Sequence, residues 1–248
     1  MRGYLRTAIV LGLTVALMWF FLRSADLAAV WSHIRRARLD LLIATLGVIA
    51  VSYVVRVRRW QRLLAPIAQV GFAPAVRATV IGFATTVVLP GRLGEVLRPY
   101  LLARRERLSA SAVLATIVVE RLLDVIAVVL LFGVFLLFFS GDLQQTDPQV
   151  LTYLKVGGLV AAVGAGAMLA LIVVAAGAPD RVAGVVAQVE RVLPQRFGAA
   201  AGRFIIRFRA GLGIARQPGR FMRAFAWSFP LWLSVAASVW CVCQAFGI

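Results

Sequence analysis

The chain has 248 residues, of which 62% are hydrophobic and only 15% charged, a composition that excludes an ordinary soluble domain. Its formal net charge is +17, and every one of its 27 basic residues except Lys155 is an arginine. The arginines lie between apolar runs, so they indicate membrane topology and contact with anionic lipid headgroups rather than nucleic-acid binding.

The apolar runs predict an all-α fold, a polytopic helical membrane bundle that forms one domain over 1–248. In chain order the predicted spans are 7–22, 39–55, 109–139, 150–176 and 225–248, with a re-entrant segment at 72–90. Because the sequence stops within apolar residues, we expect the natural chain to continue past Ile248.

The first two spans are flanked by segments that suit a membrane surface. Residues 7–22 end in aromatic residues rather than in the small residues of a cleavage site, so we expect a retained anchor. Residues 23–38 place apolar side chains at helical spacing, which predicts an interfacial helix. After the second span, the basic and aromatic cluster with Arg56, Arg59 and Trp60 is typical of a membrane boundary.

The segment 72–90 is short, carries Arg77 and stops at Pro90-Gly91, which breaks an apolar helix. A broken helix inside a membrane is tolerated only against protein or a watery cavity. We therefore expect a re-entrant element here.

Two longer segments complete the predicted layout. Residues 109–139 form a helix about 46 Å long, which must tilt in or leave a hydrocarbon core about 30 Å thick. Residues 178–220 predict two basic amphipathic helices divided at Pro194. The positive-inside rule places 92–107 and 178–220 in the cytoplasm and 140–149 outside. Two topologies give this same placement. In the one that we favour, the N-terminus is cytoplasmic and 72–90 is re-entrant; in the other, the N-terminus is external and 72–90 crosses the membrane fully.

The segment after the break predicts an anion site. A helix that starts there would point its positive N-terminal end, with two arginines, at a lipid phosphate. Its acidic residue is expected to pair with the arginine three positions on. The alternative is an ordinary loop with cytoplasmic arginines. The predicted headgroup-binding residues are Gly91, Arg92, Gly94, Glu95 and Arg98.

A second polar group, Glu120, Arg121 and Asp124, lies inside an apolar run. Each such side chain costs about 2.5–3.5 kcal/mol at the centre of a spanning helix, so we expect all three to face protein or water. They are either a structural ion-pair lock between helices or part of a polar path for a headgroup or protons.

The sequence offers few parts for catalysis. His33 is the only histidine, so neither a histidine-rich metal site nor a Ser-His-Asp triad is available. Lys155 does not lie in a P-loop motif, and Cys241 and Cys243 are too close along one helix to bridge. We predict no catalytic residue, metal or cofactor, and transport that is downhill or driven by the membrane potential or a proton gradient.

Three motifs in this order resemble the lysylphosphatidylglycerol synthase transmembrane family, a flippase-like domain. They are Arg-x-x-Arg-Trp-x-x-Leu-Leu from Arg56, Pro-Gly-Arg-x-Gly-Glu-x-x-Arg from Pro90, and Glu-Arg-x-x-Asp from Glu120. The resemblance covers essentially the whole chain and implies a bundle with re-entrant elements in a bacterial or archaeal plasma membrane. It does not imply synthase activity. The Asn that often precedes the Pro-Gly motif in relatives is not found in 84–89.

Three functions are compatible with these features. The leading hypothesis is a translocator of an anionic phospholipid or lipid-linked phosphate, in which Arg92, Arg98 and Arg121 would hold the headgroup. The alternative is a non-catalytic membrane partner of a lipid synthase or glycosyltransferase, which would use the basic surface of 181–223. A membrane enzyme with Glu120 and Asp124 as acid–base groups is the third, although no nucleophile or metal set accompanies them.

Overall fold

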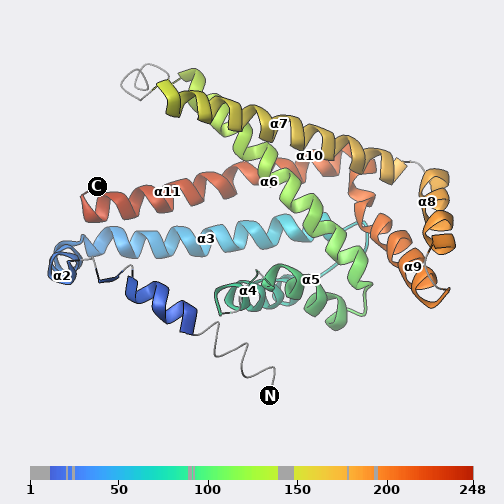
Figure 1. The fold of residues 1–248 in the computed structure, drawn as a ribbon, viewed down its shortest axis with the longest axis horizontal. Helices are drawn as coiled ribbons and strands as arrows, with labels where there is room; N and C mark the ends of the chain where they lie inside the picture. Colours follow the sequence, from blue (N-terminus) through green and yellow to red (C-terminus); the bar gives the residue numbers. More distant parts are fainter. Residues whose placement is uncertain are drawn as a thin grey trace. The chain divides into compact units, whose positions relative to one another are not determined.

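The structure is a computed structural model that describes residues 12–20, 22–23, 26–88, 91, 93–138, 148–177, 179–192 and 195–247. All regular structure in these residues is helical, which confirms the all-α prediction (Figure 1). The chain forms two compact units, one from Met1–Gly47 with Ala237–Ile248 and one from Val48–Ala236.

The elements follow one another with short connections. They are α2 (Leu27–Arg36), α3 (Leu39–Leu64), α4 (Phe72–Val88), α5 (Gly94–Arg105), α6 (Ala110–Phe138), α7 (Pro148–Gly177), α8 (Pro179–Val192), α9 (Gln195–Gly211), the 3-10 helix η3 (Leu212–Arg216), α10 (Pro218–Ala226) and α11 (Ser228–Phe246).

Three helical stretches in the described part of the chain are long and apolar enough to cross a membrane. They are Leu39–Leu64, Gln149–Ala175 and Pro218–Phe246. They correspond to the second, fourth and last predicted spans, but the helix of the second continues past Val55 through the arginine cluster. Within the first predicted span, residues 12–20 are helical, whereas 7–11 and 21 lie outside the described residues.

α6 confirms a helix over nearly all of 109–139, about 44 Å long. It is not among the three stretches that meet the criterion for a span. Its passage through a membrane stays a prediction.

The surface of α7 is what a lipid-facing helix requires. Large apolar side chains such as Leu159, Val160 and Val163 are about two-thirds exposed. A soluble protein rarely leaves so continuous an apolar surface in water, whereas hydrocarbon solvates it at no cost. The exposed surface therefore agrees with a membrane environment.

In the first unit, α2 leads into α3 and meets the end of α11. The backbone N–H of Arg38 donates to the carbonyl oxygen of Ala245 at 3.0 Å. α2 confirms the helix predicted within 23–38, and it exposes Trp31 and Ile34. Its place at a membrane surface stays a prediction.

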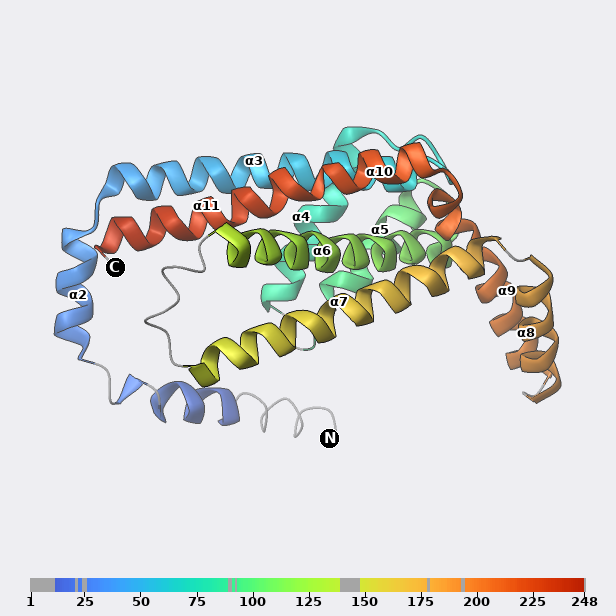
Figure 2. The same ribbon diagram turned by 90° about the horizontal axis from the view of Figure 1, so that it is seen from above.

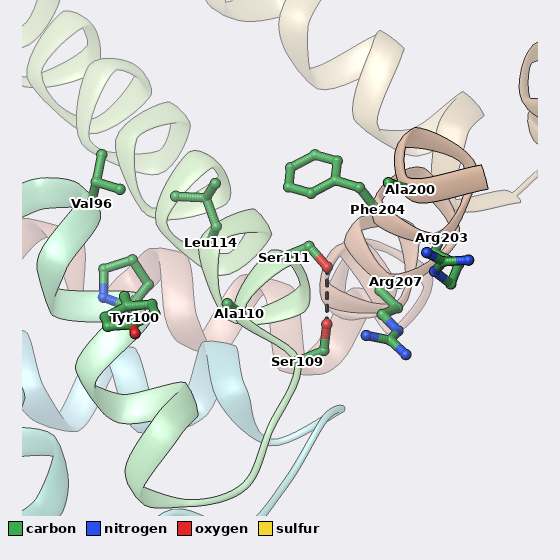
Figure 3. Close-up of a pocket in the computed structure, with 11 residues that line it drawn as sticks. Val96, Tyr100, Ser109, Ala110, Ser111, Leu114, Ala200, Arg203, Phe204 and Arg207 are labelled. Carbon is green, nitrogen blue, oxygen red and sulfur yellow. Dashed lines mark hydrogen bonds between the residues drawn. The ribbon is translucent and has the colours of Figure 1, made fainter. Parts of the chain in front are cut away.

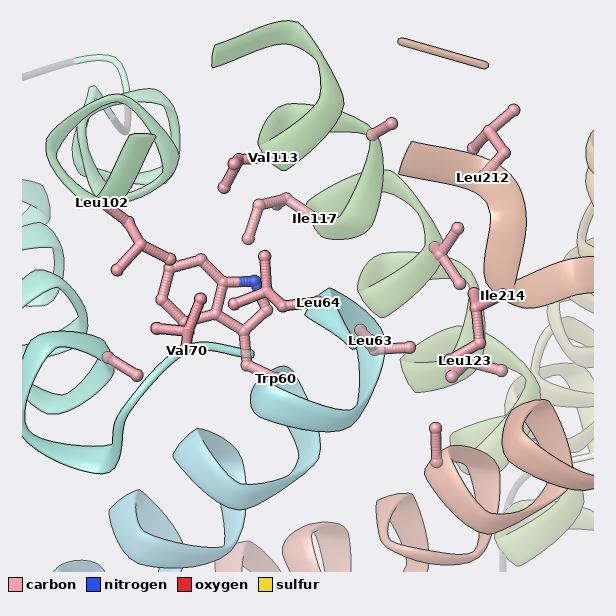
Figure 4. Packing of buried hydrophobic residues seen from close by; sticks show 14 of the residues in the cluster. Trp60, Leu63, Leu64, Val70, Leu102, Val113, Ile117, Leu123, Leu212 and Ile214 are labelled. Carbon is pink, nitrogen blue, oxygen red and sulfur yellow. The ribbon is translucent and has the colours of Figure 1, made fainter. Parts of the chain in front are cut away.

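The core of the second unit gathers around Trp60, near the end of α3 (Figure 4). Its indole is fully buried among apolar side chains from α3, α5 and α6 and from the loop after α3, including Leu64, Val70, Leu102 and Ile117. The core thereby fixes the end of α3 against α5 and α6, the three helices that carry most of the charged residues described below.

α4 and α5 pack side by side as a helical hairpin, which both views show (Figures 1 and 2). Their contact depends on glycine. A Cβ at Gly94 would collide with the Gly82 carbonyl and with Thr86, and a Cβ at Gly82 would lie 2.7 Å from Cβ of Arg98. The chain thus turns back on itself at the predicted break. A re-entrant path through a membrane stays a prediction.

α8 and α9 confirm the two helices predicted in 178–220, and they also pack side by side (Figure 2). Gly211, at the end of α9, lies so close to α6 that a Cβ would collide with the carbonyl of Ala112. α9 is therefore held against the first turns of α6. The predicted divider Pro194 lies outside the described residues.

Candidate functional site

A buried network of charged side chains joins α3, α5, α6 and α11 within the second unit. Its centre is the guanidinium of Arg59, which is fully buried. Nη1 of Arg59 donates to Oδ1 of Asp124 at 2.6 Å and to Oγ of Ser228 at 2.8 Å, and Nη2 donates to Oε1 of Glu120 at 3.2 Å. A single arginine thus pairs with both acids of α6.

Glu120 is also fully buried, and it is held by a second arginine from α5. Nη1 of Arg98 lies 3.3 Å from Oε1 and 3.2 Å from Oε2 of Glu120. The guanidinium of Arg98 lies over the Trp60 ring, 3.8 Å from its centroid, in a cation–π arrangement. Nη1 of Arg56 approaches Oε1 of Glu120 at 4.0 Å. Burial of one carboxylate is therefore compensated by three arginines.

Two indoles complete the inner part of the network. Nε1 of Trp232, on α11, donates to Oδ1 of Asp124 at 3.1 Å. Nε1 of Trp60 donates to Oγ1 of Thr116 at 3.1 Å. These bonds satisfy the two indole N–H groups and fix the orientation of the Trp60 and Trp232 rings.

The outer part of the network is exposed. Arg121 and Glu95 have side chains 40% and 37% exposed, and Nε of Arg121 lies 3.8 Å from Oε2 of Glu95. Nη1 of Arg121 also lies 3.5 Å from Oδ2 of Asp124, one turn along α6. Arg121 therefore connects the buried acids to the surface.

The network carries a surplus of positive charge and of hydrogen-bond donors. Among the described residues named above, four arginines face three carboxylates. Four donors, Nε of Arg59, Nε and Nη2 of Arg98 and Nε of Arg121, are buried without a hydrogen-bond partner, against one acceptor, Oδ2 of Asp124. Unpaired buried donors are costly, and an anion with several oxygen acceptors is the ligand that would satisfy them.

The network is closed in this structure. The cavity beside Arg98, lined by Gly82, Thr86, Gly94 and Arg121 among others, has a volume of about 10 Å³. Such a space holds a water molecule at most. The cavity therefore leaves no room beside Arg98 for a group larger than water in this arrangement.

Three of the predicted headgroup residues, Gly94, Glu95 and Arg98, line this one small cavity. Arg98 pairs with Glu120 rather than with Glu95, and Arg92 lies outside the described residues. Gly91 has a φ of +77°, a conformation that favours glycine. Gly94 serves the close packing of α4 and α5.

Two residues of the predicted membrane boundary at the end of α3 lie inside the protein, and the boundary itself stays a prediction. Arg59 and Trp60 are fully buried inside the protein, whereas neighbouring Arg58 is exposed. Burial of Arg59 is possible because Glu120 and Asp124 neutralise it. The sequence held a signal for this, since α6 carries two acids but only Arg121 as a cation.

The acidic and basic residues of α6 only partly face the interior as predicted. Glu120 and Asp124 are buried, and Arg121 lies partly at the surface. Within the part of the chain that the structure describes, no cluster of His, Cys, Asp or Glu could hold a metal ion.

Comparison with known proteins gives one match. Residues 5–248 match the family described as Lysylphosphatidylglycerol synthase TM region. No curated protein and no solved structure matches the chain.

Proposed function

Because this chain is a multi-pass membrane protein that belongs to the lysylphosphatidylglycerol synthase TM region family, we propose that it translocates an anionic lipid across the membrane. The ligand class is a phospholipid or lipid-linked carrier with a phosphate in its headgroup. We further propose that the chain is not itself an enzyme, since the matched region is the transmembrane part of that family and no catalytic domain is identified in it.

One observation carries this proposal: the buried network is rich in arginine, and several of its guanidinium N–H groups have no hydrogen-bond partner. Arginine offers a planar fork of N–H groups that fits a phosphate. Arg98 uses only Nη1 toward Glu120 and leaves Nη2 and Nε unpaired. A purely structural lock would be expected to leave fewer buried donors unsatisfied.

The geometry suggests how a headgroup is handled. If the α4–α5 hairpin shifts, Arg98 exchanges the carboxylate of Glu120 for a lipid phosphate. Glu120 stays paired with Arg59, so no carboxylate is left buried and uncompensated. Arg121 and Glu95 at the exposed edge form the first polar contacts on the way in.

The test is a headgroup-accessibility assay in proteoliposomes. Fluorescent phosphatidylglycerol, phosphatidylcholine and a lipid-linked phosphate are reconstituted with the purified full chain, and accessible label is quenched from outside. We expect protein-dependent quenching of the inner-leaflet label for at least one of the anionic lipids and much slower exchange of phosphatidylcholine. Failure of every anionic lipid to cross faster than in protein-free vesicles would overturn the proposal.

A second candidate function is supported by a different surface. α8 to α10 expose arginines including Arg191, Arg203, Arg207, Arg216 and Arg220. Such a basic surface suits an acidic partner such as a lipid synthase or glycosyltransferase. In that case the partner would be retained by the chain at low salt, and no lipid would move in the assay above.

A further inference from the structure

We infer that the groove between α5, α6 and α9 is a second site, which binds the phosphodiester headgroup of one anionic membrane phospholipid. The groove has a volume of about 360 Å³, and no charged residue of the buried network is among the residues that line it. Figure 3 shows these lining residues. Binding at the groove rests on the proposed function only in that it takes lipid as the ligand, and the role of the groove in loading rests on that function.

The charge of the groove selects an anion. Arg203 and Arg207 stand four positions apart on α9 and so lie on one face of that helix. Like charges at this spacing repel each other. No acidic residue lines the groove, and no hydrogen bond or ion pair of either arginine is found within the described residues. A bound anion would remove the repulsion and engage both guanidinium groups.

Hydroxyl groups complete the polar side. Oγ of Ser109 and Oγ of Ser111 lie 2.9 Å apart, and Figure 3 shows this pair between the arginines and the side chains of α5. One hydroxyl donates to the other, so one hydroxyl hydrogen of the pair is left to donate to a ligand. Tyr100 contributes a phenolic oxygen at the opposite wall.

The remaining walls are apolar, which favours a lipid over a free phosphate. Val96, Pro99, Leu114 and Phe204 line the groove beside its polar groups. A soluble phosphate compound would leave this surface in water, whereas the glycerol and first acyl carbons of a phospholipid would cover it. α9 is also the helix predicted to lie on the membrane surface, where such lipids are present at high concentration.

The position of the groove relates it to the network. Val96 and Pro99 belong to the same helix, α5, as Glu95 and Arg98. A lipid in the groove would contact α5, one helix of the hairpin that is proposed to shift during transport. The groove therefore fits a loading site, occupied before the headgroup meets Arg98.

The inference is tested by photo-cross-linking in nanodiscs. The purified full chain is placed in phosphatidylcholine nanodiscs with a trace of phosphatidylglycerol that carries a photoactivatable acyl chain, and labelled peptides are quantified by mass spectrometry. The variant R203Q/R207Q removes the two groove arginines. R191Q/R216Q removes equal charge from exposed positions outside the groove.

We expect labelling of peptides from α5, α6 and α9 to fall about tenfold in R203Q/R207Q and to stay near the wild-type level in R191Q/R216Q. Unlabelled phosphatidylglycerol should compete, whereas phosphatidylcholine and soluble glycerol 3-phosphate should not. Equal losses in both variants, or equal competition by phosphatidylcholine, would overturn the site. Competition by glycerol 3-phosphate as strong as that by the lipid would overturn the lipid as ligand.

The outcome is independent of transport. A wild-type chain that labels the groove but moves no lipid would refute the proposed function and leave the site intact. A chain that moves lipid without labelling the groove would refute the site alone.

Discussion

Nη2 of Arg59, on α3, lies 3.2 Å from Oε1 of Glu120, on α6, and both side chains are fully buried. Neither residue can be neutralised by its own helix alone, so each makes the burial of the other possible. Together with Asp124 and Arg98, the pair joins α3, α5 and α6. Each of these charges would be buried without a partner if the helices separated.

Removal of the central arginine should be the most damaging single change in the network. In Arg59→Ala both Glu120 and Asp124 lose a partner, and we expect a loss of about 3–5 kcal/mol in the free energy of unfolding. Thermal unfolding in detergent measures it. Arg58→Ala, which removes a neighbouring exposed arginine and its cation–π contact with Phe72, should cost about 1 kcal/mol or less. Equal losses for the two variants would show that the buried pairs do not hold the helices.

Arg121 should matter much less for stability than Arg59. Its side chain is 40% exposed, and its nearest carboxylate oxygen, on Asp124, is at 3.5 Å. We expect Arg121→Ala to cost about 1 kcal/mol or less, because water replaces the lost contacts. The same unfolding experiment, with Arg59→Ala beside it, gives the ranking. A cost as large as that of Arg59→Ala would place Arg121 inside the structural core.

The hairpin should depend on its two facing glycines. In Gly94→Ala the new Cβ would collide with the backbone of Gly82, and we expect a loss of about 1–3 kcal/mol. Gly133→Ala is the matched control, since no atom lies within 4 Å of its Cβ position in α6 and alanine favours a helix. The unfolding temperature should fall in the first variant and stay or rise in the second. An unchanged Gly94→Ala would contradict the close packing of α4 and α5.

The re-entrant path predicts that both ends of the hairpin lie on one side of the membrane. Single cysteines at Gln69 and at Arg104, exposed positions within 66–70 and 100–104, should react with a membrane-impermeant reagent from the cytoplasmic side in a chain whose Cys241 and Cys243 are replaced by serine. Labelling in vesicles of known orientation shows on which side of the membrane each cysteine lies. Reaction of the two cysteines from opposite sides would mean that the segment crosses fully.

Much of the fold follows from the sequence. The apolar runs predict α3, α6, α7 and α11 because an uninterrupted apolar stretch of that length has few other stable structures. The burial of Glu120 and Asp124 follows from the cost of charge in hydrocarbon. Both features depend on the local sequence and not on how the helices pack.

The partners of these acids could not be predicted in the same way. Arg59 and Arg98 are separated from Glu120 by many residues, and only the packing of α3, α5 and α6 brings them together. Gly94 shows a related difficulty. From the Pro-Gly break, a glycine is expected to provide backbone conformations that other residues rarely adopt. Gly94 instead lacks the Cβ that would keep α4 and α5 apart.

The most direct test of the central claim compares Arg98→Lys with Arg104→Lys in the phosphatidylglycerol accessibility assay. Lysine at 98 keeps the charge beside Glu120, so the chain should still fold, but it lacks the planar fork that binds a phosphate. Arg104 is an exposed arginine of the same helix. We expect Arg98→Lys to fold with a lower unfolding temperature, because lysine loses the planar stacking over Trp60, and to move lipid about tenfold more slowly, while Arg104→Lys matches the wild type in both measurements. Wild-type rates in both variants would contradict the claim.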